Sequence, residues 1–95
     1  MTDIIEEIKI YYKDSKQLGK HFYIINDQIE GECKRYHKNG QLGIHCFYKN
    51  DKLDGEYKSY ESNGQLHEYS FYKNNRINGK NKLYNSNGVR ALLLK

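Results

Sequence analysis

The sequence predicts an all-β protein, an elongated single-layer twisted antiparallel sheet built from about four β-hairpin repeats. One turn sequence, Tyr-x-x-Asn-Gly, occurs three times at a constant spacing, at 36–40, 60–64 and 84–88. A period of about 24 residues is typical of repeat architectures. Ten Tyr and three Phe are spread along a chain without Pro, and such residues favour a pleated surface. Disordered segments are poor in aromatic residues, so a folded sheet is expected.

The repeat divides a single domain, residues 1–95, into four units. A degenerate unit covers 7–30, two well-matched units cover 31–54 and 55–78, and a truncated unit covers 79–95. The positions that recur define the repeat and are assigned structural roles: Gly31, Gly55 and Gly79; Tyr36, Tyr60 and Tyr84; Asn39-Gly40, Asn63-Gly64 and Asn87-Gly88; Leu42 and Leu66; and Tyr48 and Tyr72.

Each unit is interpreted as a hairpin whose strands flank its Asn-Gly turn, because both turn residues tolerate positive φ. The first unit is the weakest match, with Glu7 in the glycine column and Ser15-Lys16 in place of Asn-Gly. In the third unit the expected strands are 56–61 and 66–73, and the segment 49–55 returns the chain from the second unit to the third. The fourth unit retains only a short second strand, Val-Arg-Ala-Leu-Leu-Leu-Lys.

Two registers are compatible with each Asn-Gly turn. A two-residue loop on Asn39-Gly40 places Cys33 opposite Cys46, whereas a three-residue loop with Gly40 in the left-handed region pairs Tyr36 with Leu42. The three-residue loop is preferred, because it gathers the regular columns on one face. In that arrangement Leu42, Ile44 and Tyr48 share the face of Tyr36. An error of one residue would invert this face assignment.

The unit from Gly55 to Gly79 resembles a MORN repeat, through Gly-Glu-Tyr-Lys-Ser-Tyr, Asn-Gly-Gln-Leu and Phe-Tyr-Lys-Asn. It is closest to the longer variant with Tyr-x-x-Asn-Gly that occurs in bacterial and giant-virus proteins. The resemblance covers roughly residues 12–90 and implies an elongated sheet that mediates protein association. In some members it also implies membrane attachment, and some bacterial members are described as toxin–antitoxin components.

The bulk composition indicates an intracellular protein, in the cytoplasm, or in host cytoplasm or a virion if the source is viral. No segment approaches the about 20 apolar residues of a membrane helix, and the N-terminus lacks the pattern of a secretory signal. Two cysteines do not make a disulfide framework. The formal net charge of +4 arises from interspersed charges, which is not the footprint of a nucleic-acid-binding protein.

No enzymatic, metal-binding or cofactor-binding pattern is present, and neither a cofactor nor a small-molecule substrate is expected. The four histidines, His21, His37, His45 and His67, lack zinc-ligand spacing and are interpreted as surface or stacking residues. Cys33 and Cys46 are interpreted as small buried fillers. The alternative, a redox pair, requires the two-residue register and an oxidising compartment.

A non-catalytic module for protein–protein interaction or assembly is the preferred function. Lys34, Lys58 and Lys82 recur once per repeat on the face of Tyr36, and an apolar surplus is expected on the other face, from Phe47, Phe71, Tyr57 and Tyr69. The alternatives are peripheral binding to anionic lipid and an antitoxin-like inhibitory role. A homodimer is also expected, through the exposed C-terminal edge strand that carries Leu92, Leu93 and Leu94.

Overall fold

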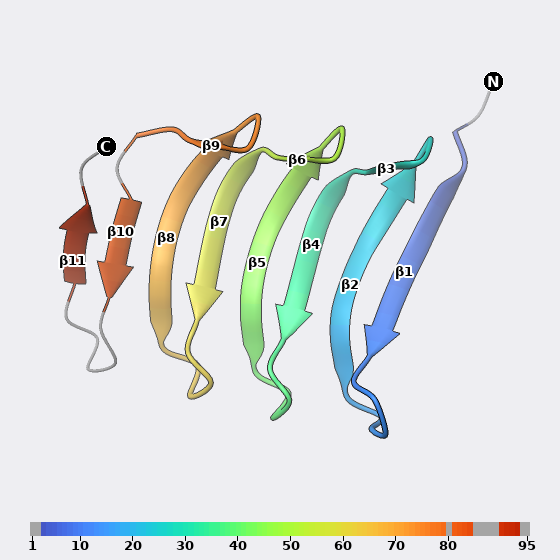
Figure 1. Cartoon of the computed structure of the whole chain (residues 1–95), viewed down its shortest axis with the longest axis horizontal. Helices are drawn as coiled ribbons and strands as arrows, with labels where there is room; N and C mark the ends of the chain where they lie inside the picture. The colour runs from blue at the N-terminus through green and yellow to red at the C-terminus, as the bar shows by residue number, and fades with distance from the viewer. Residues whose placement is uncertain (1–2, 80, 85–89, 94–95) are drawn as a thin grey trace.

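The computed structural model describes residues 3–79, 81–84 and 90–93, which form one open antiparallel sheet (Figure 1). Eight strands follow one another across it in chain order: β1 (Ile5–Tyr11), β2 (Leu18–Ile25), β4 (Gly31–Tyr36), β5 (Leu42–Lys49), β7 (Gly55–Tyr60), β8 (Leu66–Lys73), β10 (Asn81–Tyr84) and β11 (Arg90–Leu93). Three two-residue strands pair at the ends of longer ones: β3 (Gln28–Ile29) with β2, β6 (Lys52–Leu53) with β5, and β9 (Arg76–Ile77) with β8.

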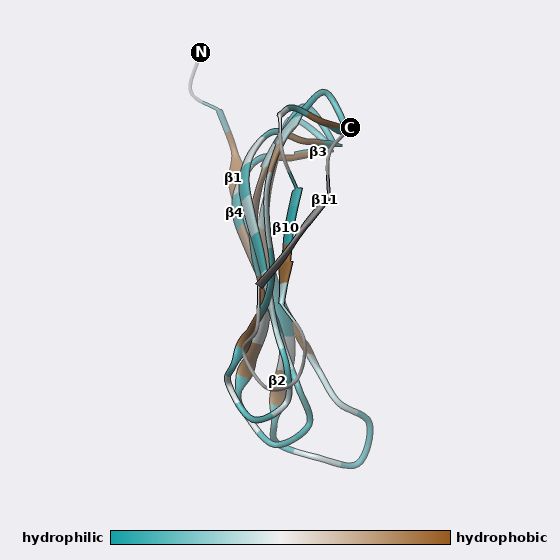
Figure 2. Ribbon diagram, turned by 90° about the vertical axis from the view of Figure 1, so that its left-hand side faces the viewer, coloured by the Kyte–Doolittle hydropathy of each residue, from teal (hydrophilic) through white to brown (hydrophobic). Residues whose placement is uncertain are grey.

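The sheet is a single twisted layer, as the sequence predicts. Its extents are 48 × 35 × 15 Å, and the edge-on view in Figure 2 shows no second layer over the described residues. Eight strands at about 4.8 Å spacing contribute roughly 34 Å of the long dimension. The predicted fold class is therefore confirmed.

The Asn-Gly turns are three-residue loops. The His37 N–H donates to Gln41 O at 2.8 Å, the Gly40 N–H donates to His37 O at 2.9 Å, and Gly40 has a φ of +91°. The Asn39 carboxamide oxygen accepts the Gln41 N–H at 2.9 Å. The turn at 61–65 repeats all of these features. This geometry is a type I turn followed by a left-handed residue, and it confirms the preferred loop length.

A β-bulge directly after the turn changes the register. Tyr36 pairs with Leu42 as predicted, but the register shifts between Arg35 and Tyr36, so that Cys33 pairs with Cys46 further along the hairpin. A bulge adds one residue to one strand and inverts the alternation of faces beyond it. The expected sharing of a face with Tyr36 was therefore wrong for two residues, which instead pack against Cys33 and Cys46: Ile44 and Tyr48.

The opposite ends of the hairpins carry a second kind of turn; the return of the chain at 49–55 was predicted, but the type of turn was not. Asn50 and Asp51 both have positive φ, 51° and 69°, and the pairs at 26–27 and 74–75 do the same. Two consecutive positive φ values define a type I′ two-residue turn. The sequence lacks the Gly that usually marks such a turn, but Asn and Asp tolerate this conformation. These turns fold β3, β6 and β9 back onto the sheet.

The apolar face is centred on the middle of each hairpin. Cys33 and Cys46 are each 3% exposed, free and directly opposite one another, which fits the interpretation as buried fillers. Phe22 is 8% exposed. Half-buried residues surround these three: Ile8, Ile24, Ile29, Ile44, Tyr48, Leu53 and Tyr57. Tyr36, Tyr60 and Tyr84 are half-buried at the turn ends of their strands and lie outside this cluster.

Neighbouring hairpins share short ladders. Three joints, β2–β4, β5–β7 and β8–β10, each contain two residue pairs, whereas β4 and β5 form six. Side-chain hydrogen bonds reinforce the joints at the type I′ turns. Asp51 Oδ1 accepts the Ile29 N–H at 2.7 Å, and the Asp51 N–H donates to Ile29 O at 3.1 Å. Asn75 makes the same two contacts with Leu53, at 2.7 and 2.9 Å.

The Asn-Gly ends are joined in a similar way, one repeat to the next. The Tyr12 hydroxyl donates to Tyr36 O at 2.5 Å. His37 Nε2 lies 2.8 Å from Tyr60 O, so the hydrogen bond requires the proton on Nε2. The Asn39 carboxamide also donates to Ser62 O at 2.7 Å. Successive hairpins are therefore linked at both ends as well as at the central ladder.

Replacing Gly64 with Val should destabilise the protein by about 1–3 kcal/mol, because a β-branched side chain is strained at positive φ. The space around Gly64 does not decide the outcome, since an added Cβ would only reach ordinary contact with Gln41, at 3.4 Å. Gly64→Asn is the matched control, because Asn tolerates this conformation, and it should cost clearly less. Urea denaturation measures both; equal losses would contradict the turn assignment.

Replacing Asp51 with Gly should cost about 1–2 kcal/mol, since the Ile29 N–H loses its acceptor while the positive φ is still permitted. Asp51→Asn should be nearly neutral, because Asn75 makes the same hydrogen bonds in the next repeat. The free energies of unfolding of the two variants should therefore differ. If both variants unfold at the same denaturant concentration, the side-chain hydrogen bond does not stabilise the joint.

Candidate interaction face

Two rows of side chains run across the sheet on the face opposite the Cys33–Cys46 cluster. The first row consists of residues that pair directly from strand to strand: Lys9, His21, Lys34, His45, Lys58, Tyr69 and Lys82. The second row consists of three pairs of an acid with an aromatic ring: Glu7 with Tyr23, Glu32 with Phe47, and Glu56 with Phe71. We call these two rows together the Glu–Lys face.

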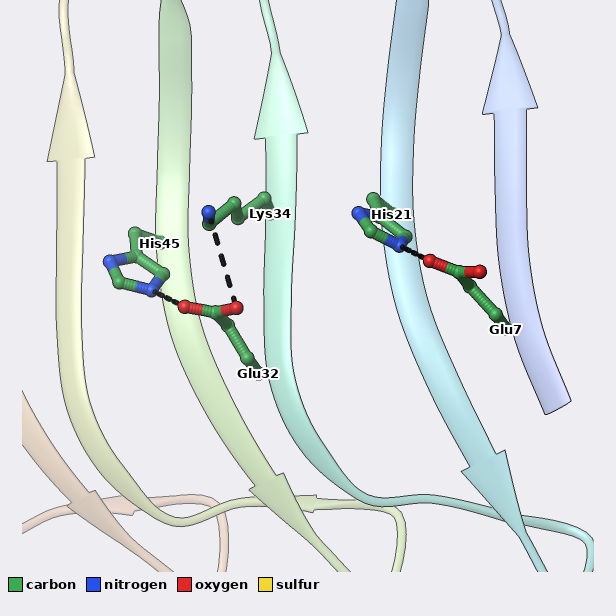
Figure 3. Close-up of polar contacts among 5 residues, drawn as sticks. All are labelled: Glu7, His21, Glu32, Lys34 and His45. Atoms are coloured by element: carbon green, nitrogen blue, oxygen red, sulfur yellow. Dashed lines mark hydrogen bonds and ion pairs between the residues drawn. The ribbon is translucent and has the colours of Figure 1, made fainter. Parts of the chain in front are cut away.

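Each carboxylate of the second row accepts a hydrogen bond from a ring of the first row. His21 Nε2 lies 2.8 Å from Glu7 Oε2, and His45 Nε2 lies 2.7 Å from Glu32 Oε2 (Figure 3). In the next repeat Tyr69 takes the histidine position, and its hydroxyl donates to Glu56 Oε2 at 2.6 Å. One arrangement is therefore built three times, with a phenol replacing an imidazole.

The lysines of the first row lie against these carboxylates and rings. Lys34 Nζ is 4.0 Å from Glu32 Oε1 (Figure 3), and Lys58 Nζ is 3.5 Å from Glu56 Oε1. The ammonium groups of Lys58 and Lys82 lie 5.5 and 5.9 Å from the centroid of the Tyr69 ring, within cation–π range. Lys34 and Lys58 each therefore face an acid from their own strand.

Aromatic rings of the two rows stack in pairs along the strands. The ring centroids are 5.2 Å apart for His21 and Tyr23, 5.3 Å for His45 and Phe47, and 5.7 Å for Tyr69 and Phe71. Phe71 is 47% exposed. The Glu–Lys face thus combines charges of both signs with accessible apolar rings.

The structure changes the expected distribution of candidate binding residues between the two faces. Lys34 pairs with His45, whose ring stacks on Phe47. Lys58 pairs with Tyr69, whose ring stacks on Phe71. The lysines therefore share one face with Phe47, Tyr69 and Phe71. The expectation that the lysines and these rings lie on opposite faces was wrong. The register beyond the bulge is the physical reason, since it differs by one residue from that of the turn.

Tyr57 is the one expected ring that does not join this face. It pairs with Ser70 and packs against the Cys33–Cys46 cluster, and its ring stacks on Tyr72 with centroids 5.4 Å apart. Burial raises the pKa of the Tyr57 phenol, and the nearby Glu68 carboxylate raises it further.

The acids of the Glu–Lys face were missed by sequence reasoning. His21 and His45 were expected as surface or stacking residues, and they do stack on Tyr23 and Phe47, but their hydrogen bonds to the acids were not expected. His21 and His45 are separated by one repeat period, as are Glu32 and Glu56, so both pairs occupy repeat columns that could have been read. The histidine column was not recognised because Tyr69 occupies the position where a third histidine would complete it. A column that keeps a hydrogen-bonding ring while changing its residue type is not evident from identity alone.

The predicted self-association residues fall only partly within the described chain. Leu92 and Leu93 belong to β11, which pairs with β10 alone among the described strands. Leu94, Asn87 and Gly88 lie outside the described residues. Self-association through this edge stays a prediction.

A groove of about 420 Å³ lies beside the Asn-Gly turns. Its lining comes from three successive repeats and is mostly aromatic or ionisable: Tyr12, Arg35, Tyr36, His37, Tyr60, Glu61 and His67, together with Gly43, Ile44 and Ser59. His37 is hydrogen-bonded to Tyr60 O, and His67 Nδ1 lies 2.8 Å from Glu61 Oε2.

Across the described ranges no group of three His, Cys, Asp or Glu side chains could hold a metal ion. Those ranges also contain no helix able to cross a membrane.

The buried thiols titrate as a pair. A hydrogen bond from Cys46 lowers the pKa of Cys33 to about 7, against the opposing effect of burial and with help from Lys20 and Arg35. The same hydrogen bond and burial raise the pKa of Cys46. Their low exposure limits any reaction that needs a second molecule at the sulfur.

The hydrogen bond from the Tyr69 hydroxyl is the main cause of the lowered pKa of Glu56, and Lys58 lowers this pKa further. Tyr69→Phe should therefore raise the pKa of this carboxyl group, which an NMR titration of its side chain measures. A carboxyl group whose folded-state pKa lies below its unfolded-state pKa contributes stability above the unfolded-state pKa, and this contribution is lost as the pH falls through the folded-state pKa. The free energy of unfolding of Tyr69→Phe should therefore depend less on pH in the acid range. Tyr23→Phe, on a strand that does not contact Glu56, should leave the titration unchanged.

The comparisons with known proteins agree with this architecture. The family model described as the MORN repeat variant matches twice, at residues 29–50 and 53–74. Neither the curated proteins nor the solved structures gave a match. The two matched segments start at positions 29 and 53, an offset equal to that between Asn39 and Asn63 and therefore to the period of the hairpins. The chain is a MORN-repeat protein of the variant type.

Proposed function

We propose that this chain is a non-catalytic module that binds a protein partner through the Glu–Lys face. MORN repeats are generally non-catalytic modules of protein and membrane interactions. The observation that carries the proposal is the composition of this face, where charges of both signs lie beside aromatic rings in each repeat, with half-buried Tyr23 and Phe47 and exposed Phe71. Interfaces are enriched in aromatic residues that supply most of the binding energy, surrounded by polar groups.

A protein partner fits this face better than an anionic lipid surface. Binding to lipid headgroups relies on Lys and Arg that are free to face the membrane, whereas Lys34 and Lys58 each lie beside a glutamate. The carboxylates Glu7 and Glu32 are 51% and 43% exposed, and they would be repelled by anionic headgroups. A partner with its own alternating charges can satisfy both rows. An antitoxin-like inhibitor would be one such case.

Phe71→Ser tests this proposal, because Phe71 is the most exposed ring on the Glu–Lys face. We expect about tenfold weaker binding to the protein captured from the source cell, as for loss of an interface anchor. The free energy of unfolding should change by less than about 0.5 kcal/mol. Ile4→Ser is the matched control, since Ile4 is 75% exposed but belongs to neither row of this face, and it should bind normally.

Vesicle flotation separates the lipid alternative. When mixed with vesicles that contain phosphatidylserine, the wild-type chain should stay at the bottom of the density gradient and not rise with the vesicles. Flotation of the wild type that Lys34→Glu with Lys58→Glu abolishes would replace the proposal with lipid binding. Unchanged capture of the partner by Phe71→Ser would place the binding site elsewhere.

A further inference from the structure

The first strand, β1, is an open edge of the sheet. Among the described residues only β2 pairs with it, so its outer N–H and C=O groups have no ladder partner there. Four of the five exposed large hydrophobic residues in the described ranges lie in or beside this strand: Ile4, Ile5, Ile10 and Tyr11, at 75, 64, 49 and 53%. An edge of this length and apolarity is a template for pairing with another strand.

The residues that flank β1 at both ends form hydrogen bonds with interior parts of the sheet, and these bonds do not cover the outer edge of β1. At its start, the Asn26 carboxamide donates to Asp3 Oδ1 at 3.3 Å. At its end, the Tyr12 hydroxyl reaches inward to Tyr36 O. Figure 1 shows no other described segment along the outer side of β1.

We propose that the β1 edge binds β1 of a second copy of the chain, antiparallel and centred on Ile8. The sequence of the strand, Ile-Glu-Glu-Ile-Lys-Ile-Tyr, is complementary to itself in this register. Ile8 lies opposite Ile8 of the second copy, and Glu7 lies opposite Lys9 of the second copy on both sides of the axis. Directly opposite charges stabilise an antiparallel pair, and directly opposite like charges destabilise it.

The other registers lack this complementarity. Alternate residues of β1 direct their N–H and C=O groups either away from the sheet or toward β2. A shift of one residue would place a residue of the first kind opposite a residue of the second kind, so the hydrogen-bonded ladder could not form. A shift of two residues in one direction places Lys9 opposite Lys9, and in the other direction it places Glu7 opposite Glu7. Charges on an edge strand usually prevent pairing, and here they do so in every nearby register except the one centred on Ile8.

The geometry also limits the contact to a closed pair. The register of β1 with β2 shifts between Ile10 and Tyr11, and such a bulge twists the edge, so the new ladder spans Glu6–Ile10. An antiparallel pairing of two identical strands has a two-fold axis, which closes the assembly at two copies. Pairing of β1 with β11 of another copy would instead be head-to-tail and would produce longer assemblies.

A charge swap at this edge tests the register. Sedimentation equilibrium of the wild-type chain should show a species of twice the 11.3 kDa chain mass. Lys9→Glu places two glutamates opposite one another at both charged pairs of the dimer and should weaken association by roughly 10- to 30-fold. Adding Glu7→Lys to that variant restores opposite charges and should restore the dimer. Lys16→Glu, an exposed residue of the adjoining loop, makes the same charge change and should have no effect.

A cysteine at the axis gives a second test that does not depend on affinity. Ile8→Cys places two thiols opposite one another at about 4.5–5.5 Å between Cα atoms, within disulfide range. Oxidised glutathione should convert them to an intermolecular disulfide, releasing two reduced glutathione molecules. Lys9→Cys lies off the axis and should cross-link far less, and the wild type, whose two cysteines are buried, should not cross-link.

Several results would overturn the proposal. These are a wild-type monomer at millimolar concentration, a dimer that Lys9→Glu does not weaken, or a dimer that Leu92→Lys alone abolishes. Equal cross-linking of the Ile8→Cys and Lys9→Cys variants would reject the register. All of these results report the association state of the chain, whereas partner capture is tested with Phe71→Ser on β8, far from this edge in the strand order. This inference and the proposed function can therefore fail separately.

Discussion

Neighbouring hairpins in this sheet share only two residue pairs at each central joint, and the rest of the structure depends on how these joints are reinforced. Each hairpin alone would be marginal, because isolated two-stranded hairpins rarely fold in water. Stability therefore comes from contacts between nearest neighbours, as in other repeat proteins. The side chains that cross the joints at both ends, from Asp51 to Ile29 and from Tyr12 to Tyr36, explain why turn residues recur with the period of the hairpin.

The same joints organise the Glu–Lys face. Lys34 pairs with His21 across one joint, and Lys58 pairs with His45 across the next, so the first row of the face lies where hairpins meet. A single-layer sheet has no second layer to cover this face. Its glutamates and rings consequently satisfy one another locally while remaining partly accessible to solvent. The residues that stabilise the repeat are thus the same ones that form the proposed binding surface.

The fold could be read from the sequence because its signals are local. Gly40 and Gly64 mark their turns through positive φ, and the constant period of these turns gives the order of the hairpins. The face assignments could not be read, because they depend on a bulge. The shift at Tyr36 leaves the turn in one register and the Cys33–Cys46 pair in the other. Alternation counted from the turn therefore misplaced Tyr48, and it separated Lys34 from Phe47.

The candidate site was only partly predictable, because its contacts also depend on the register. Lysines that recur once per repeat were evident, but the contact of Glu32 with His45 crosses to the next strand and exists only once the register is known.

The two proposed surfaces are geometrically compatible. The two-fold axis of an antiparallel strand pair is perpendicular to the sheet, so pairing through β1 keeps each face of the two copies on the same side. The Glu–Lys faces of a dimer would then form one surface of twice the length. Two linked sites bind a repetitive or dimeric partner more tightly than one, without any new contact, because the second binding event becomes intramolecular. The proposed edge and the proposed face would therefore reinforce one another, and they share only Glu7 and Lys9, where the face meets the edge.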